Sequence, residues 1–243
     1  MKVLIFYVLF YFVSISIQAQ TAFKNPGMPS SETFEISDYI DNTIGYVTAK
    51  ISYSLKENNG KKIYHIFVTE GNVFSNEIDV NYSDLTTISE KRVSLKTNAM
   101  LEYFSNNGAN SIHLYNKEKG LDKNYSTKDK NIYSRYAYFF AFSGFPFETG
   151  KSVTFKSYMF EYGDALTMKV VSLGRQKVTV KAGTYDCYKL ELSIASWQSF
   201  FASDKYVLYY AVASPHHFVK YEETESNGKL NANELLRITS LVK

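Results

Sequence analysis

The sequence predicts a mainly β protein: a single antiparallel curled sheet or half-barrel of roughly a dozen strands, with a short aromatic helix covering its concave face. Three observations support this fold class. Apolar and polar residues alternate with period two along many short segments, turn residues separate those segments, and one aromatic stretch has helical spacing instead. Because strands do not alternate with long helical segments, a βαβ fold is not expected.

The first predicted strand spans residues 47–55. Apolar residues such as Ala49, Ile51 and Tyr53 take every second position, and polar residues take the positions between them. This pattern is typical of a strand that buries one face. Asn58-Asn59-Gly60 follows as a tight-turn signal, because Asn and Gly tolerate positive φ, and residues 63–68 form the expected partner strand.

The same alternation continues to the end of the chain. Residues 117–130 interrupt it with many Lys, Asp and Asn residues, and we expect a solvated loop there. The remaining predicted strands are residues 78–82, 100–104, 112–115, 153–162, 166–170, 178–180, 188–194, 206–212, 218–221 and 236–238.

One aromatic stretch has the period of a helix. Its apolar residues recur at i, i+3, i+4, i+7 and i+8, and Phe145-Pro146 ends it. The helix is apolar nearly all round, so the sheet must enclose it or it must roof a cavity. A core plug and a ligand lid are both open interpretations. The residues with this spacing are Tyr133, Tyr136, Ala137, Phe140 and Ala141.

The N-terminus has the features of an export signal. Lys2 precedes an apolar run at residues 3–17, and Ala19 marks a cleavage site. We therefore expect a signal peptide at residues 1–19, a polar leader at 20–37 and one β domain at 38–243. An uncleaved N-terminal anchor is the alternative.

The cysteine content bears on where the mature protein resides. Cys187 is the single cysteine, so no lipid-attachment cysteine lies near the cleavage site and no internal disulfide can form. The mature protein is expected to be periplasmic or secreted and not membrane-spanning. The alternating pattern around Cys187 indicates a strand residue rather than a nucleophile.

Charge and motifs exclude several function classes. The 27 basic and 24 acidic residues are too evenly balanced for a nucleic-acid-binding surface. No phosphate loop, dinucleotide fingerprint, nucleophile elbow or paired-cysteine metal site is present, so we expect a protein that is not an enzyme and has no cofactor and no metal. His216-His217 is a poor metal pair, because adjacent residues on a strand point to opposite faces.

Aromatic residues are abundant, with 21 Tyr and 18 Phe against one Trp. Amphipathic rings on a concave sheet suit an acyl chain or a sugar, although rings also fill ordinary β cores.

A family resemblance rests on residues 178–192, where two strands flank the turn Ala182-Gly183-Thr184-Tyr185. The later strands at 206–210 and 218–222, Pro215, Leu235 and the aromatic helix fit the same pattern. The chain resembles an uncharacterised family of exported bacterial proteins, a domain of unknown function, over residues 130–240 and more loosely before them. Such proteins look similar to the lipoprotein-localisation carriers, so the resemblance implies a half-barrel with an apolar concavity. The family has no agreed catalytic residues to carry over.

These observations lead to one functional hypothesis and two alternatives. The hypothesis is an exported, non-enzymatic protein that binds an apolar or amphiphilic, lipid-like cell-envelope ligand on its concave face. The first alternative is a packed β scaffold that binds an outer-membrane protein partner, and the second, ranked last, is a glycan hydrolase with two facing carboxylates. The candidate ligand-binding residues are Tyr136, Phe140, Phe155, Tyr158, Tyr188 and Tyr206.

Overall fold

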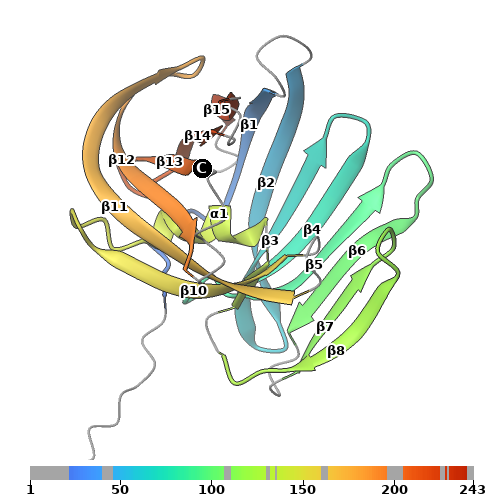
Figure 1. Ribbon diagram of the computed structural model, residues 1–243. Helices are drawn as coiled ribbons and strands as arrows, with labels where there is room; N and C mark the ends of the chain where they lie inside the picture. The colour runs from blue at the N-terminus through green and yellow to red at the C-terminus, as the bar shows by residue number, and fades with distance from the viewer. Residues whose placement is uncertain are drawn as a thin grey trace, which may run out of the picture.

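The structure, a computed structural model, is mainly β, and the residues that it describes form one open curled sheet with one short α-helix. It describes residues 22–39, 46–106, 111–129, 132–134, 136–159, 164–195, 205–224, 228 and 230–239. The predicted signal peptide and its cleavage site lie outside the described residues. Fifteen strands form the sheet in the order β8-β7-β6-β5-β4-β3-β2-β1-β15-β14-β13-β12-β11-β10-β9 (Figure 1).

All neighbouring strands are antiparallel except β9 and β10, which are parallel. The strands are β1 Ser31–Tyr39, β2 Tyr46–Asn58, β3 Lys61–Glu70, β4 Phe74–Asn81, β5 Thr87–Ser94, β6 Met100–Asn106, β7 Ser111–Asn116, β8 Leu121–Ser126, β9 Ile132–Ser134, β10 Ser152–Met159, β11 Asp164–Val180, β12 Gly183–Ile194, β13 Lys205–Ala211, β14 Phe218–Thr224 and β15 Leu230–Thr239.

The predicted fold class is confirmed, but the count of roughly a dozen strands was too low. The sequence reading missed β1, β5, β8 and β9, and it divided β11 into two strands. Strand β5 has polar side chains at most positions, and β8 is a mostly exposed edge strand within the predicted loop at 117–130. Edge strands need no apolar face, so their sequences resemble loops.

The predicted helix is shorter than its spacing indicated. Tyr133 belongs to β9, and α1 spans only Ala137–Ala141, followed by the 3-10 helix η1 at Phe142–Gly144. Phe145 then adopts an extended conformation with φ −67° and ψ 142°. This is the expected end, because the residue before a proline disfavours the helical region.

Helix α1 lies inside the curl of the sheet (Figure 1) and contacts both halves of it. The Phe140 ring lies 5.2 Å from that of Tyr53 on β2, and the Tyr138 ring lies 6.0 Å from that of Phe155 on β10. The Tyr210 hydroxyl of β13 donates to the Phe139 carbonyl at 2.5 Å. The helix is therefore enclosed by the sheet and joins its two halves.

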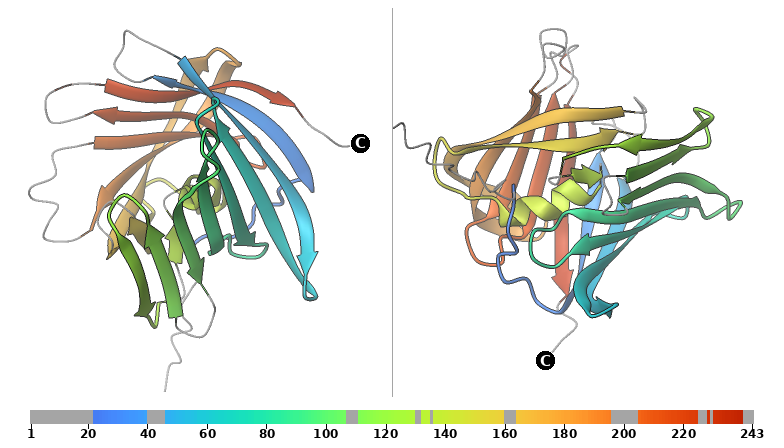
Figure 2. Two further views of the ribbon diagram at one scale, coloured as in Figure 1. Left: turned by 90° about the vertical axis from the view of Figure 1, so that its right-hand side faces the viewer. Right: turned by 90° about the horizontal axis from the view of Figure 1, so that it is seen from below.

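The predicted polar leader contributes to the core. Strand β1 begins at Ser31, ahead of the expected domain start at 38, and Phe23 is only 1% exposed. The Phe23 ring makes edge contacts with Tyr133 at 5.0 Å and Phe142 at 5.2 Å. The leader segment crosses beside α1 at one end of the half-barrel (Figure 2). Burying a phenyl ring contributes roughly 1.5–3 kcal/mol, which explains why this short segment docks.

The end strand β9 approaches β5 and is joined to it by hydrogen bonds to side chains. The Ser134 amide of β9 donates to Thr87 Oγ1 of β5 at 2.9 Å, and the Ser134 hydroxyl donates to the buried Glu90 carboxylate. The Tyr133 hydroxyl donates to the Asp84 carbonyl at 3.2 Å. Strands β6 to β8 continue past this junction, and their buried residues pack on Ile132 and Tyr158.

A bulge in β11 allows the long β11–β12 hairpin to bend. The pairing with β12 shifts register between Ser172 and Gly174, and Gly174 has a φ of +105° that residues with a Cβ rarely adopt. Beyond the bulge, the tip of the hairpin packs in a second cluster with Leu235 of β15. The Ala182 amide donates to the Leu235 carbonyl at 3.2 Å and fixes this contact.

Among the residues that the structure describes, no helix has the length and apolarity that a membrane crossing requires.

We predict that Gly144→Ala releases the leader segment. A Cβ at this position would lie 2.0 Å from the Lys24 backbone oxygen, and backbone cannot move aside as a flexible side chain can. We expect a loss of roughly 2–4 kcal/mol in the free energy of unfolding, measured by urea titration, together with early proteolysis near the N-terminus.

Gly60→Ala provides the comparison. It changes a glycine with φ +73° in open space, so only backbone strain of roughly 1 kcal/mol is expected and the leader should stay protected. Equal proteolysis of the two variants would contradict the packing described for the leader.

Candidate functional site

The concave face around α1 carries the largest apolar cluster of the protein. Its fully buried rings include Tyr64, Tyr133 and Phe142. Other apolar side chains pack against this cluster and stay partly exposed; they come from the helix and from both halves of the sheet. We call the following residues the apolar belt: Ile51, Val68, Phe139, Phe140, Ile194, Tyr206 and Tyr221.

The structure places four of the six predicted ligand-binding residues at this cluster. Phe155 is 3% exposed, so it is a core residue rather than a lining one. Phe140 and Tyr206 belong to the apolar belt, and Tyr136 is partly buried beside them. The Tyr206 ring stacks near that of Tyr221, with centroids 6.4 Å apart.

The other two predicted residues lie elsewhere. Tyr158 packs in a separate cluster with Phe104, at a ring distance of 5.7 Å. Tyr188 stacks on Phe147 at 4.2 Å and lies under the Arg175 guanidinium, whose carbon is 4.8 Å from the ring centre. The six residues therefore do not form one continuous lining. Tyr158 is three positions from Phe155 on β10, so the two side chains point to opposite faces of that strand. Tyr188 contacts Phe147, which packs against the main cluster.

A row of polar side chains crosses the same concave face on strands β3 to β7. Register pairs Asn76 with Arg92, Arg92 with Glu102, and Glu102 with Asn116. Asn76 is two positions from Ile78 on β4, and Glu70 is two positions from Val68 on β3, so both point to the face of the main cluster. We call Glu70, Asn76, Arg92, Glu102 and Asn116 the polar ladder.

Hydrogen bonds and one longer ion pair connect the ladder from end to end. Arg92 Nη2 lies 3.1 Å from Glu70 Oε2, and its Nη1 lies 3.8 Å from Glu102 Oε2. Asn76 Nδ2 donates to Glu70 Oε1 at 3.0 Å, and Asn116 Nδ2 donates to Glu102 Oε1 at 3.3 Å. Two carboxylates thus face one guanidinium, which leaves the ladder formally negative.

Helix α1 is tied to this ladder at its N-terminal cap. Arg92 Nη1 donates to the Tyr136 hydroxyl at 2.6 Å, and the guanidinium carbon lies 4.2 Å from the centre of the Phe74 ring. Tyr136, predicted as a ligand-binding residue, therefore presents its hydroxyl to a charged network. Buried within the ladder, the Asn76 Oδ1 and Arg92 Nε atoms have no hydrogen-bond partner.

A second buried polar group lies on β1. Glu32 is 3% exposed, and its Oε2 accepts a hydrogen bond from the Tyr53 hydroxyl at 3.1 Å. His217 Nδ1 lies 3.2 Å from the same oxygen. Burial lowers the pKa of His217, while the Glu32 carboxylate opposes that effect. Burial and Glu32 both raise the pKa of Tyr53.

The two adjacent histidines serve different partners. His216 Nδ1 lies 3.0 Å from the Ala211 carbonyl oxygen, and its ring contacts Phe147 at 4.8 Å. His217 instead faces Glu32. Within the described ranges, no group of three or more His, Cys, Asp or Glu side chains is placed to hold a metal ion.

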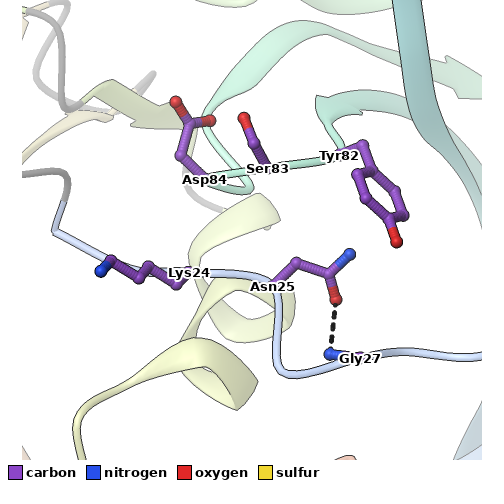
Figure 3. Close-up of a pocket in the computed structure, with 6 residues that line it drawn as sticks. All are labelled: Lys24, Asn25, Gly27, Tyr82, Ser83 and Asp84. Atoms are coloured by element: carbon purple, nitrogen blue, oxygen red, sulfur yellow. Dashed lines mark hydrogen bonds between the residues drawn. The ribbon is translucent and has the colours of Figure 1, made fainter.

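An open pocket of about 460 Å³ lies between the leader segment and the β4–β5 turn (Figure 3). Asn25 shapes one wall, because its Oδ1 accepts the Gly27 amide at 3.0 Å. None of the six predicted residues lines this pocket. It is lined by Lys24, Asn25, Gly27, Tyr82, Ser83 and Asp84.

Sequence reasoning missed both the ladder and the pocket. The ladder residues lie on five strands, and only the register of the sheet brings them together. A polar residue at an inward position of an alternating strand was the available signal, as at Asn76 before Ile78. The pocket depends on the leader segment, which the sequence reading had placed outside the domain.

The fold and its concave face define the class: an antiparallel β half-barrel that encloses an aromatic helix. The chain belongs to the family described as "Protein of unknown function (DUF3108)", which matches residues 33–233. The resemblance predicted from the second half of the chain is therefore confirmed, and it extends over the first half as well. No curated protein matches the chain.

Several solved structures are similar to this one. A β-barrel-like protein of the domain of unknown function DUF1849 from Brucella abortus is 7% identical, with a TM-score of 0.49 over 87% of this chain and 97% of that one. A Bacteroides fragilis protein with a YmcC-like fold is 14% identical, with a TM-score of 0.33 over 90% and 100%. The hypothetical lipoprotein YmcC from Escherichia coli is 7% identical, with a TM-score of 0.31 over 88% and 89%. Likenesses at this level carry no argument about function.

We predict that Cys187 is unreactive in the native protein. The side chain is fully buried on β12, and burial raises the pKa of its thiol to about 12. Since the thiolate is the reactive form, alkylation by iodoacetamide at pH 8 should be on the order of 1,000-fold slower than in urea. Mass spectrometry measures the rates. Comparable labelling with and without urea would contradict the burial of this thiol.

Proposed function

We propose that the protein is an exported, non-enzymatic binding protein that holds an apolar or amphiphilic, lipid-like envelope molecule against its concave face. The observation that carries this proposal is the composition of that face. Partly exposed apolar side chains of the belt lie on the same face as the polar ladder. A molecule with an apolar chain and a polar head is complementary to such a surface.

Export rests on the predicted signal peptide at residues 1–19. The non-enzymatic character rests on the lack of a catalytic motif in the sequence. The density of rings supports the apolar part of the ligand, because Tyr and Phe present large flat contact areas with little loss of conformational entropy.

A second candidate is a packed β scaffold that binds a protein partner at the outer membrane. The position of α1 favours this candidate, because its rings already contact both halves of the sheet and occupy part of the concave face. The two functions make different demands on the apolar belt. A ligand needs the belt to be accessible, whereas a scaffold uses it as core.

Native mass spectrometry separates the two candidates. Residues 20–243 are exported into a bacterial periplasm, purified without detergent and weighed. The binding proposal predicts a co-purifying mass that is released on unfolding and extracts into organic solvent. A bare polypeptide that also fails to bind the uncharged apolar probe N-phenylnaphthylamine would favour the scaffold.

We predict that Tyr206→Lys weakens probe binding by at least about ten-fold, because an ammonium group in the belt must be desolvated when an apolar molecule binds. Tyr206 lies opposite Glu223 in the β13–β14 register, so the lysine gains a neighbouring carboxylate that supports folding. Fluorescence titration measures the dissociation constant.

Leu173→Lys is the matched control, because Leu173 is 47% exposed at the β11 bulge and lies outside the main cluster. Its affinity for the probe should equal that of the unmodified protein, and the melting temperatures of both variants should confirm folding. An unchanged affinity in folded Tyr206→Lys would remove the belt from the binding site.

A further inference from the structure

We propose that three hairpin turns at one end of the sheet dock on the surface of an anionic phospholipid bilayer. They are the β3–β4 turn at residues 71–73, the β5–β6 turn at 95–99 and the β7–β8 turn at 117–120. Strands β3 to β8 are antiparallel neighbours, so alternate turns lie at the same end of the sheet, as Figure 1 shows. The inference goes beyond the proposed function, because it concerns a membrane contact and needs no molecule on the concave face.

Exposed apolar side chains gather at these turns. Among the residues that the structure describes, five large apolar side chains are exposed. Three of the five lie here: Val73 is 38% exposed, Leu95 is 47% exposed, and Met100, where β6 begins, is 36% exposed. Single exposed apolar residues are ordinary on a protein surface, whereas a contiguous group of them indicates an interaction surface.

Backbone hydrogen bonds join the three turns into one surface. The Leu95 amide donates to the Val73 carbonyl at 2.8 Å, which connects the β5–β6 turn to the β3–β4 turn. The Lys117 amide donates to the carbonyl of Leu101, the residue after Met100, at 2.8 Å, which connects the β7–β8 turn to β6. The three exposed apolar side chains are therefore contiguous.

The charge of the turns favours an anionic partner. Three exposed lysines and one glutamate, Glu118, give the turns a formal charge of +2. In the described part of the chain, no ion pair engages any of these lysines. We call the apolar and basic side chains together the tip patch: Val73, Leu95, Lys96, Met100, Lys117 and Lys119.

The chemistry of the tip patch fits a bilayer better than a protein partner. Binding to a membrane surface grows with the apolar area inserted between the head groups and with the attraction of Lys side chains to anionic lipids, so a few side chains of each kind suffice. A stable protein interface takes roughly 20–30 residues on each side, more than these three short turns contain.

The tip patch also adjoins the concave face. Val73 precedes Phe74, whose ring lies 4.2 Å from the guanidinium carbon of Arg92 in the polar ladder. Met100 is two positions from Glu102, another member of the ladder. A bilayer in contact with the tip patch would therefore lie at the edge of the concave face.

Vesicle flotation tests this proposal. The mature protein, residues 20–243, is mixed at low ionic strength with vesicles of phosphatidylethanolamine and phosphatidylglycerol, or with vesicles of phosphatidylcholine alone. We expect a partition coefficient at least about ten-fold higher for the anionic vesicles, which falls as salt screens the lysines. Absence of binding to the anionic vesicles, or equal binding to both kinds, would overturn the proposal.

Leu95→Asn tests the apolar part of the tip patch. It removes the most exposed apolar side chain of the patch, so the partition coefficient for anionic vesicles should fall about ten-fold. Leu173→Asn is the matched control, because Leu173 is also 47% exposed but lies at the β11 bulge, and its partition coefficient should not change. With melting temperatures showing both variants folded, equal partition coefficients would contradict insertion at the turns.

Lys96→Gln with Lys119→Gln tests the basic part in the same assay. The preference for anionic over neutral vesicles should fall about ten-fold, because two of the three attracting charges are lost. The control is Lys56→Gln with Lys169→Gln, which removes two exposed lysines on β2 and β11 away from the turns. A preference that both double variants lose equally would show that net charge alone is responsible and would overturn the proposal.

A fluorescent label reports insertion directly. Cys187 is buried, so a thiol-reactive nitrobenzoxadiazole dye labels the new cysteine of Leu95→Cys or, as control, of Leu173→Cys. Anionic vesicles should shift the emission of the first label to the blue and leave the second unchanged. Equal shifts, or none at position 95, would overturn the proposal. The N-phenylnaphthylamine titration is a separate measurement on the concave face, so either idea can fail while the other stands.

Discussion

The contact of one aromatic core with both halves of the sheet is the constraint on which the rest of this structure depends. A fifteen-stranded sheet in which β8 and β9 are the ends has no complete closure by backbone hydrogen bonds. Its curl is fixed instead by side chains that meet inside it, chiefly those of α1 and Phe23. Aromatic contacts suit this purpose, because each ring buries a large area and prefers edge-on neighbours at 4.5–7 Å.

This core also explains the placement of the polar groups. Where β9 meets β5, the amide and hydroxyl of Ser134 donate to the side chains of Thr87 and Glu90 rather than to backbone groups of β5. The ladder centred on Arg92 continues this polar strip along the inner face, and Tyr136 joins it to the helix. Buried networks of this kind are favourable only when their members are largely paired, so they fix one arrangement of the strands. The concave face is consequently apolar on one side and polar on the other.

The sequence was informative wherever local chemistry determines local structure. Asn59 and Gly60 both adopt the positive φ that the turn signal predicts, and Pro146 follows the end of the helical stretch. The sequence was less informative where contacts between distant parts of the chain determine the structure. Phe23 lies in a leader with no alternating pattern around it, and nothing near it in the chain indicates the four rings that bury it. The ladder depends on strand register in the same way. The separation of Tyr158 from Phe155, in contrast, follows from their spacing of three positions on β10, which the sequence itself contains.

The central claim is that the concave face, with the belt and the ladder together, is where a ligand binds. Hydrogen–deuterium exchange with and without dodecyl maltoside tests it most directly. The account predicts slower exchange in β3, β5 and α1 and no change at the tip of the β11–β12 hairpin. Protection confined to the leader segment and the β4–β5 turn would place the ligand in the pocket beside Asn25 and contradict the claim.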